Sequence, residues 1–193
     1  YSLGVSPGTR IRGNRIHDVR CYGYGGQGIY PDEGTSYVLI ENNVAVATDT
    51  GGLVMNYGRD NIVRNNVFGL SRDRQLAWGS PKKYASFRFE RNIVVWREGE
   101  LLLGSWFDGL VQNVFRKNCY WKASGAPADF GGVPWERWRA AGYDRDSAVA
   151  DPLLADPEGG DFSLRADSPA RRLGFKPVDV STAGPRRRAR ETG

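Results

Sequence analysis

The chain has 193 residues, of which 40% are hydrophobic, enough for the core of one or two domains. The net charge is +5, and most of it comes from four arginines in the last nine residues. No apolar window approaches the roughly 18 residues of a membrane span, and two cysteines and one histidine exclude a disulfide framework or a histidine metal cluster. We expect no membrane span, metal, cofactor or nucleic acid partner, and a disordered basic tail at 181–193.

One short pattern recurs five times between residues 11 and 120. It consists of an apolar residue, two variable residues, asparagine, one variable residue and a second apolar residue. The five asparagines are Asn14, Asn42, Asn65, Asn92 and Asn118, with spacings of 28, 23, 27 and 26 residues. This period suits one coil of a parallel β-helix, and asparagine suits both a sharp bend and a polar ladder along the axis. Residues 1–121 therefore predict an all-β, right-handed parallel β-helix of about five coils.

A further strand is visible in each coil. Residues 28–34 align with residues 52–58 at a spacing of 24, and later equivalents lie around 75–78 and 101–104. This alignment predicts that Asp32, at the end of its strand, lies one coil away from Asn56.

The repeat ends after Trp121. Residues 122–133 are rich in Gly, Ala and Pro and indicate a loop, and residues 134–141 predict a short helix that Gly142 ends. We expect residues 122–180 to cap the last coil, because an open solenoid end exposes backbone and apolar surface. No matching cap precedes residue 11, so we also expect upstream coils of the same protein as a partner of the first coil.

Asp32 and Glu33 are the best candidates for catalysis. They are adjacent at the end of a strand, where side chains alternate between faces, so one of them points outward. Glycosidases place two carboxyl groups about 5–9.5 Å apart, a spacing that neighbouring coils supply. Asp73 is the candidate second acid, with Asp49 and Asp108 as alternatives. The sequence Asp-Glu-Gly is equally typical of a simple turn.

The candidate substrate-binding residues combine flat rings with polar groups. Aromatic rings stack on the C–H faces of sugars, although such rings also pack in cores. An arginine suits an acidic sugar, with solvated surface charge as the alternative, and His17 is either a general base or a turn residue. The predicted substrate-binding set is Tyr30, Asn56, Tyr57, Arg59, Trp78 and Trp106.

Several segments together resemble a bacterial group of right-handed β-helix proteins that overlaps glycoside hydrolase family 141. They are residues 13–19, 25–34, 40–44, 57–66, 89–94 and 150–175, so the likeness spans roughly residues 9–185. The resemblance implies a secreted or periplasmic glycoside hydrolase acting on plant or pectic polysaccharide, with Asp32 at the matching acidic position.

The chain departs from that group beside the expected cleft. It has Val54 and Asn56 where the group usually has histidines, and Ala77 and Trp78 where the group usually has Gln and Arg. Two alternatives to a hydrolase therefore stay open. One is a non-catalytic glycan-binding or adhesion solenoid, and the other is a polysaccharide lyase or epimerase, which shares the fold.

Overall fold

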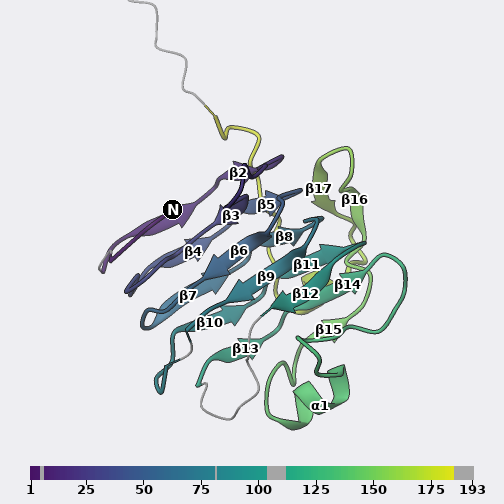
Figure 1. Ribbon diagram of the computed structural model, residues 1–193. Coiled ribbons are helices and arrows are strands. Elements are labelled where there is room, and N and C mark those ends of the chain that lie inside the picture. Colours follow the sequence, from purple (N-terminus) through teal and green to yellow (C-terminus); the bar gives the residue numbers. More distant parts are fainter. Residues whose placement is uncertain (5–6, 81, 104–111, 185–193) are drawn as a thin grey trace, which may run out of the picture.

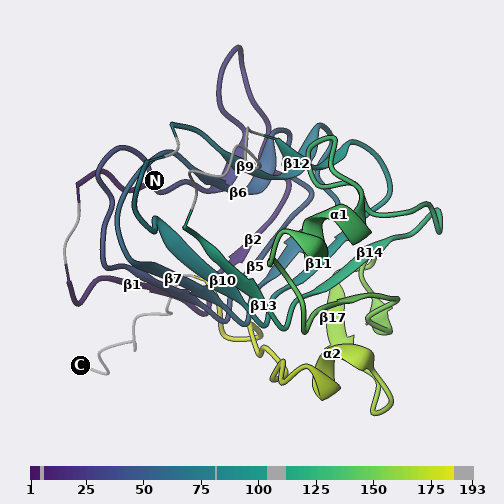
Figure 2. The ribbon, with the colours of Figure 1, turned by 90° about the horizontal axis from the view of Figure 1, so that it is seen from below.

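Three parallel sheets wind around one axis and form a right-handed parallel β-helix of about five coils, as the repeat predicts (Figure 1). The computed structural model describes residues 1–4, 7–80, 82–103 and 112–184. Seen along the stack, the sheets form the sides of a triangle (Figure 2).

Each full coil contributes one strand to each sheet. The first sheet contains β1 (Arg10–Arg12), β4 (Leu39–Glu41), β7 (Asn61–Arg64), β10 (Phe87–Glu90) and β13 (Val114–Arg116). The second contains β2 (Arg15–Ile16), β5 (Val44–Val46), β8 (Val67–Gly69), β11 (Ile93–Trp96), β14 (Cys119–Lys122) and β15 (Ala148–Val149). The third contains β3 (Gln27–Ile29), β6 (Gly51–Met55), β9 (Arg74–Trp78) and β12 (Glu100–Leu103). The strand predicted at a spacing of 24 is the third one of each coil, since Ile29 pairs with Leu53.

A stack of asparagine side chains fixes the bend between the first and second sheets. Each ladder amide donates to the side-chain oxygen of the next coil, over distances of 2.8–3.4 Å. The predicted ladder is correct in three coils and wrong by one residue in two, where Asn43 and Asn66 replace Asn42 and Asn65. The residue before each ladder asparagine adopts a left-handed backbone, and these residues are Gly13, Asn42, Asn65, Arg91 and Lys117.

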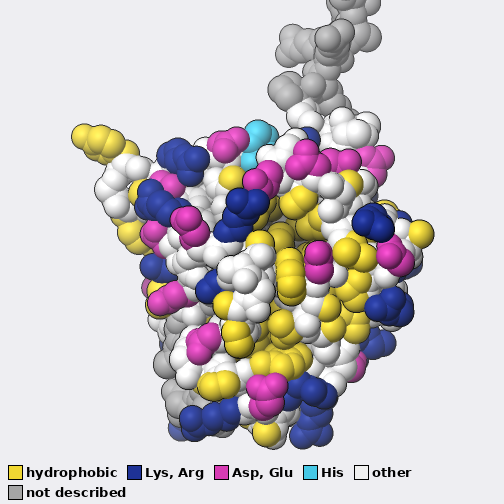
Figure 3. Space-filling view, turned by 90° about the vertical axis from the view of Figure 1, so that its right-hand side faces the viewer, with side chains coloured by type: hydrophobic (Ala, Val, Ile, Leu, Met, Phe, Trp, Pro, Cys, Tyr) yellow, Lys and Arg dark blue, Asp and Glu magenta, His cyan; other side chains and the backbone are white. Residues whose placement is uncertain are grey.

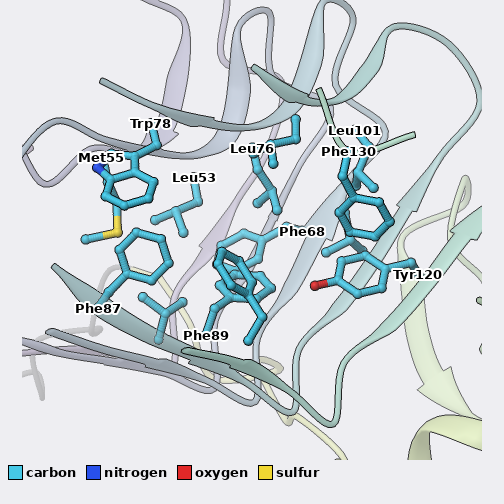
Figure 4. Packing of buried hydrophobic residues seen from close by; sticks show 14 of the residues in the cluster. Leu53, Met55, Phe68, Leu76, Trp78, Phe87, Phe89, Leu101, Tyr120 and Phe130 are labelled. Atoms are coloured by element: carbon cyan, nitrogen blue, oxygen red, sulfur yellow. The ribbon is translucent and has the colours of Figure 1, made fainter. Parts of the chain in front are cut away.

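One inward row from each sheet fills the interior, because register keeps equivalent residues one above another. The aromatic members of these rows touch between sheets: the ring centroids of Phe68 and Phe89 lie 6.0 Å apart (Figure 4). The three rows are Ile11, Ile40, Val63, Phe89 and Phe115; Ile16, Ala45, Phe68, Val94 and Tyr120; and Ile29, Leu53, Leu76 and Leu102.

Residues 122–147 close the end of the solenoid beyond the fifth coil. The predicted helix is present as α1 (Trp135–Ala140), and its Trp138 is fully buried. The Trp138 ring lies 5.2 Å from that of Phe115 and stacks at 4.8 Å on that of Phe130. This cluster covers the apolar interior that the last coil would otherwise expose.

The segment from residue 151 onward lies elsewhere than we expected. The strands β16 (Leu154–Asp156) and β17 (Asp161–Leu164) and helix α2 (Pro169–Arg172) do not extend the end cap. Instead Phe162, Leu164 and Phe175 pack on the outer face of the second sheet, against a row from four coils: Val44, Val67, Ile93 and Cys119. Figure 3 shows apolar side chains across the middle of the side of the molecule that carries this sheet, with charged ones toward its margins. The expectation that residues 122–180 cap the last coil therefore does not describe this part of the segment, which covers the apolar outer face of the second sheet over four coils.

The two thiols differ in burial. Both cysteines are free; Cys119 is buried and Cys21 is half-buried. Burial, together with the charge of Asp151, raises the pKa of the Cys119 thiol to about 12. We expect a maleimide at neutral pH to modify the native protein once, at Cys21, and the unfolded protein twice, as counted by mass spectrometry. Double labelling of the native protein would show that the second sheet opens.

Candidate functional site

A tight turn after β3 presents Asp32. The backbone N–H of Thr35 donates to the carbonyl of Asp32 at 3.0 Å, and Gly34 takes the left-handed backbone (φ 74°) that such a turn requires. The interpretation of Asp-Glu-Gly as a turn is therefore confirmed. The turn leaves Asp32 half-buried and Glu33 exposed.

Three side chains donate hydrogen bonds to the Asp32 carboxylate. The Asn56 amide of the next coil donates at 3.0 Å, Tyr1 Oη at 2.9 Å and Tyr30 Oη at 3.2 Å. The predicted neighbourhood of Asp32 and Asn56 is thus confirmed. Burial opposes ionisation of this carboxyl, but the hydrogen bonds from Asn56 and Tyr1 outweigh it and lower its pKa. Asp32 is therefore an anion at neutral pH, held at a fixed position.

A shallow groove runs beside Asp32 across the outer face of the third sheet. Tyr30 and the exposed Tyr24 form one wall, and Tyr30 carries a raised pKa from burial and its hydrogen bond with Tyr24. The floor is apolar, formed by the paired residues Val54, Ala77 and Leu103. The hollow has a volume of about 290 Å³, which is enough for one or two sugar rings. It is too shallow to enclose a cofactor.

Trp78 cannot serve as the sugar platform that we predicted. It is only 4% exposed and points into the core, where its ring lies 4.9 Å from that of Phe87 (Figure 4). Register explains this outcome, because Trp78 pairs with the inward Met55. The other predicted platform, Trp106, lies outside the described residues, as does Asp108.

Tyr57 and Arg59 follow closely after Asn56 in the chain, and each takes part in a cation–π contact. Lys82 Nζ lies 4.4 Å from the centre of the Tyr57 ring, and the Arg59 guanidinium lies 4.8 Å from that of Tyr84. These cation–π contacts occupy one face of each ring. Neither residue lines the groove beside Asp32.

The predicted second acid is not brought to Asp32. Asp73 precedes β9 at the opposite end of the third sheet, roughly 20 Å along the strand direction from the Asp32 turn. Asp49 lies beside it, buried, with Arg20 and Arg72 each at 3.2 Å. The backbone N–H of Cys21 and these arginines lower the pKa of Asp49. Asp49 and Asp73 therefore belong to an ion-pair cluster at the other end of the third sheet. Of the predicted acids that the structure describes, only Glu33 lies beside Asp32.

Sequence reasoning missed Tyr1 and Tyr24. Of the two alternatives for His17, a general base or a turn residue, the surroundings of the ring do not favour the general base. His17 is exposed and its Nδ1 lies 2.6 Å from Asp18, away from the groove. Tyr1 and Tyr24 lie outside the repeat, so spacing carried no signal for them. A local excess of tyrosine, with Tyr22, Tyr24 and Tyr30 in nine residues, was the available clue.

No protein-family model matches the chain, and no curated protein or solved structure matches it at a significant level. Within the described ranges, no three His, Cys, Asp or Glu side chains gather closely enough to hold a metal ion. Neither of the two described helices is long and apolar enough to cross a bilayer. The geometry of the groove is therefore the basis on which a function can be proposed.

Proposed function

We propose that this protein binds a neutral saccharide in the groove beside Asp32. The observation that carries the proposal is an ionised, immobilised carboxylate beside an exposed tyrosine ring and an apolar floor. A fixed carboxylate accepts hydrogen bonds from two adjacent sugar hydroxyls, while Tyr24 offers a face to the sugar C–H groups. A plant cell-wall polysaccharide, met outside the cytoplasm, is the ligand class that this site and the family resemblance favour together.

Charge argues for a neutral rather than an acidic sugar at this site. No Arg or Lys is among the described lining residues of the groove. Asp32 lies at its edge, hydrogen-bonded to the lining residues Tyr30 and Asn56, and Glu33 follows it in the chain. A uronic acid placed here would meet a like charge with no cation to compensate it.

The test is binding of neutral cell-wall oligosaccharides, such as those of xyloglucan and arabinan, by calorimetry. We expect Asp32→Asn to weaken binding about tenfold or more, since a hydrogen bond to a charged group contributes about 1.5–3 kcal/mol. Asp73→Asn, at the far end of the sheet, is the matched control and should bind as the parent does. Binding should stay constant from pH 5 to 8, because the pKa of Asp32 is lowered. Equal affinity of the Asp32 variant and the parent would refute the proposal.

Hydrolysis of the same ligand is the second candidate, and the adjacency of Asp32 and Glu33 favours it. With its lowered pKa, Asp32 suits a nucleophile or base, so Glu33 would have to donate the proton to the leaving oxygen. Release of new reducing ends by the parent, lost in both Asp32→Asn and Glu33→Gln, would establish a hydrolase. Binding without release would establish a binding module.

A further inference from the structure

A second hollow lies at the bend between the first and second sheets, away from Asp32. Its inner wall is the stack of bends, and its outer wall is the chain at residues 173–176, which we call the C-terminal strap. The strap is fastened to the bends by Asn65, whose side chain accepts from the backbone N–H of Lys176 at 2.7 Å and donates to its carbonyl at 2.9 Å. Figure 2 shows the C-terminal chain running along this corner. The hollow has a volume of about 540 Å³.

Positive charge dominates the lining. Four cationic side chains face one carboxylate, that of Glu41. Arg64 and Arg91 are each held by a carboxylate: Arg64 by Glu41 of the preceding coil at 2.8 Å, and Arg91 by Glu90, the residue before it, at 2.8 Å. Within the described part of the chain, neither Lys117 nor Lys176 forms an ion pair with a carboxylate. These two ammonium groups are free to take an external anion.

The cations are spread along the hollow and do not converge on a point. Arg91 and Lys117 hold equivalent positions on successive coils, about 4.8 Å apart along the axis, and Lys176 lies across the hollow on the strap. Arg64 lies one position earlier on the preceding coil, where it is in register with Glu90. A single phosphate is bound by donors that converge on it, whereas cations spread along the axis of a hollow match an extended polymer that carries repeated charges. The exposed Asn42 amide lies in the lining on the coil before Arg64, where it can bind hydroxyl groups at one end of the hollow.

The lining distinguishes between two kinds of polyanion. None of the residues that line the hollow is aromatic, so a single-stranded nucleic acid would find no ring on which to stack its bases. A carboxylated polysaccharide has no such requirement, because its units are recognised by charge and by hydroxyl contacts.

We infer that the hollow between the bends and the C-terminal strap is a second binding site, which takes a linear polysaccharide with one carboxylate on each unit. This second site binds an anionic ligand, whereas the Asp32 groove favours a neutral one. The second site does not depend on the function proposed for that groove. The two sites together would let one solenoid hold an acidic and a neutral stretch of the same material.

The test uses the full chain and polygalacturonate as the probe, with binding followed by fluorescence anisotropy at low salt. The double variant Lys117→Asn with Lys176→Ser removes the two unpaired cations, and asparagine suits the left-handed backbone at residue 117 (φ 56°). We expect at least a tenfold loss of affinity and a weaker dependence on salt. Lys83→Ser with Arg88→Ser removes the same charge from exposed positions outside the hollow and should change affinity less than twofold.

Several outcomes would overturn the inference. They are unchanged affinity in the double variant, an equal loss in the control variant, or single-stranded DNA binding as tightly as polygalacturonate. Asp32→Asn should leave polygalacturonate binding intact, which separates a failure here from a failure of the site proposed above. A circular dichroism spectrum identical to that of the parent shows that each variant is folded.

Discussion

Replacing Asn66 by alanine is expected to lower the free energy of unfolding by about 3–4 kcal/mol. Asn66 is fully buried in the middle of the ladder. Its oxygen accepts from the backbone N–H and the amide of Asn43 at 3.0 and 2.9 Å, and its own amide donates to the Ile40 carbonyl and the Asn92 oxygen, both at 3.0 Å. Alanine removes these four hydrogen bonds, although Asn92 keeps the one that its side-chain oxygen accepts from the backbone N–H of residue 66. Urea denaturation measures the effect.

Asn42→Gly is the matched control for the ladder. Asn42 is exposed and has a φ of 56°, a conformation that glycine adopts without strain. Among the described residues, its side chain bonds only the amide of Asn65, at 2.8 Å. We expect a loss of less than about 1 kcal/mol. If Asn42→Gly were as damaging as Asn66→Ala, the ladder would run through the first asparagine of each doublet, as the sequence alone suggested.

These doublets mark the limit of what the repeat could predict. Coil period, number of coils and the presence of an asparagine ladder follow from spacing, because a solenoid repeats the same bend in every turn. In each of the doublets Asn42-Asn43 and Asn65-Asn66, either asparagine could be the ladder residue. One of the two adopts the left-handed bend and the other is buried in the ladder, and asparagine suits both roles. Only the pairing of the neighbouring strands decides between them.

The candidate site was predictable to the extent that it belongs to the repeat. The spacing of 24 correctly placed Asn56 beside Asp32. The same register, read with the alternation of strand side chains, also puts Trp78 inside, since it pairs with Met55 two residues after the inward pair of Leu53 and Leu76. Tyr1, which lies 31 residues before Asp32 and has no counterpart in other coils, could be found only from the three-dimensional contacts.

Asp144 ends the ladder, and its replacement is the second change with a large expected effect. Every ladder amide donates in the direction of the C-terminus, so the last one, that of Asn118, needs an acceptor. Asp144 is fully buried and accepts from Asn118 and Ser147 through Oδ1, and from Tyr120 and Trp138 through Oδ2, at 2.5–3.0 Å. It therefore joins the asparagine ladder to the cap on the last coil.

Asp144→Asn is expected to cost about 2–3 kcal/mol of stability, because an amide offers one acceptor oxygen and must direct its NH2 at donors. Asparagine preserves the shape and the left-handed backbone (φ 48°), so the loss reports on the hydrogen bonds. Asp146→Asn, exposed and bound to one backbone N–H, is the control and should cost less than about 1 kcal/mol.

The pH dependence of that difference tests the electrostatics of Asp144 separately. Burial raises the pKa of this carboxyl above its usual 3.8, so the folded state holds the proton more tightly than the unfolded chain. The contribution of Asp144 to stability is then greatest below pH 3.8 and declines as the pH rises through the raised pKa; when protonated, the carboxyl can donate to the hydroxyl of Ser147 or Tyr120. The stability advantage of the parent over Asp144→Asn should therefore shrink between pH 4 and 7, as measured by urea denaturation. An advantage that grew with pH would mean that the four donors outweigh burial and keep Asp144 ionised throughout.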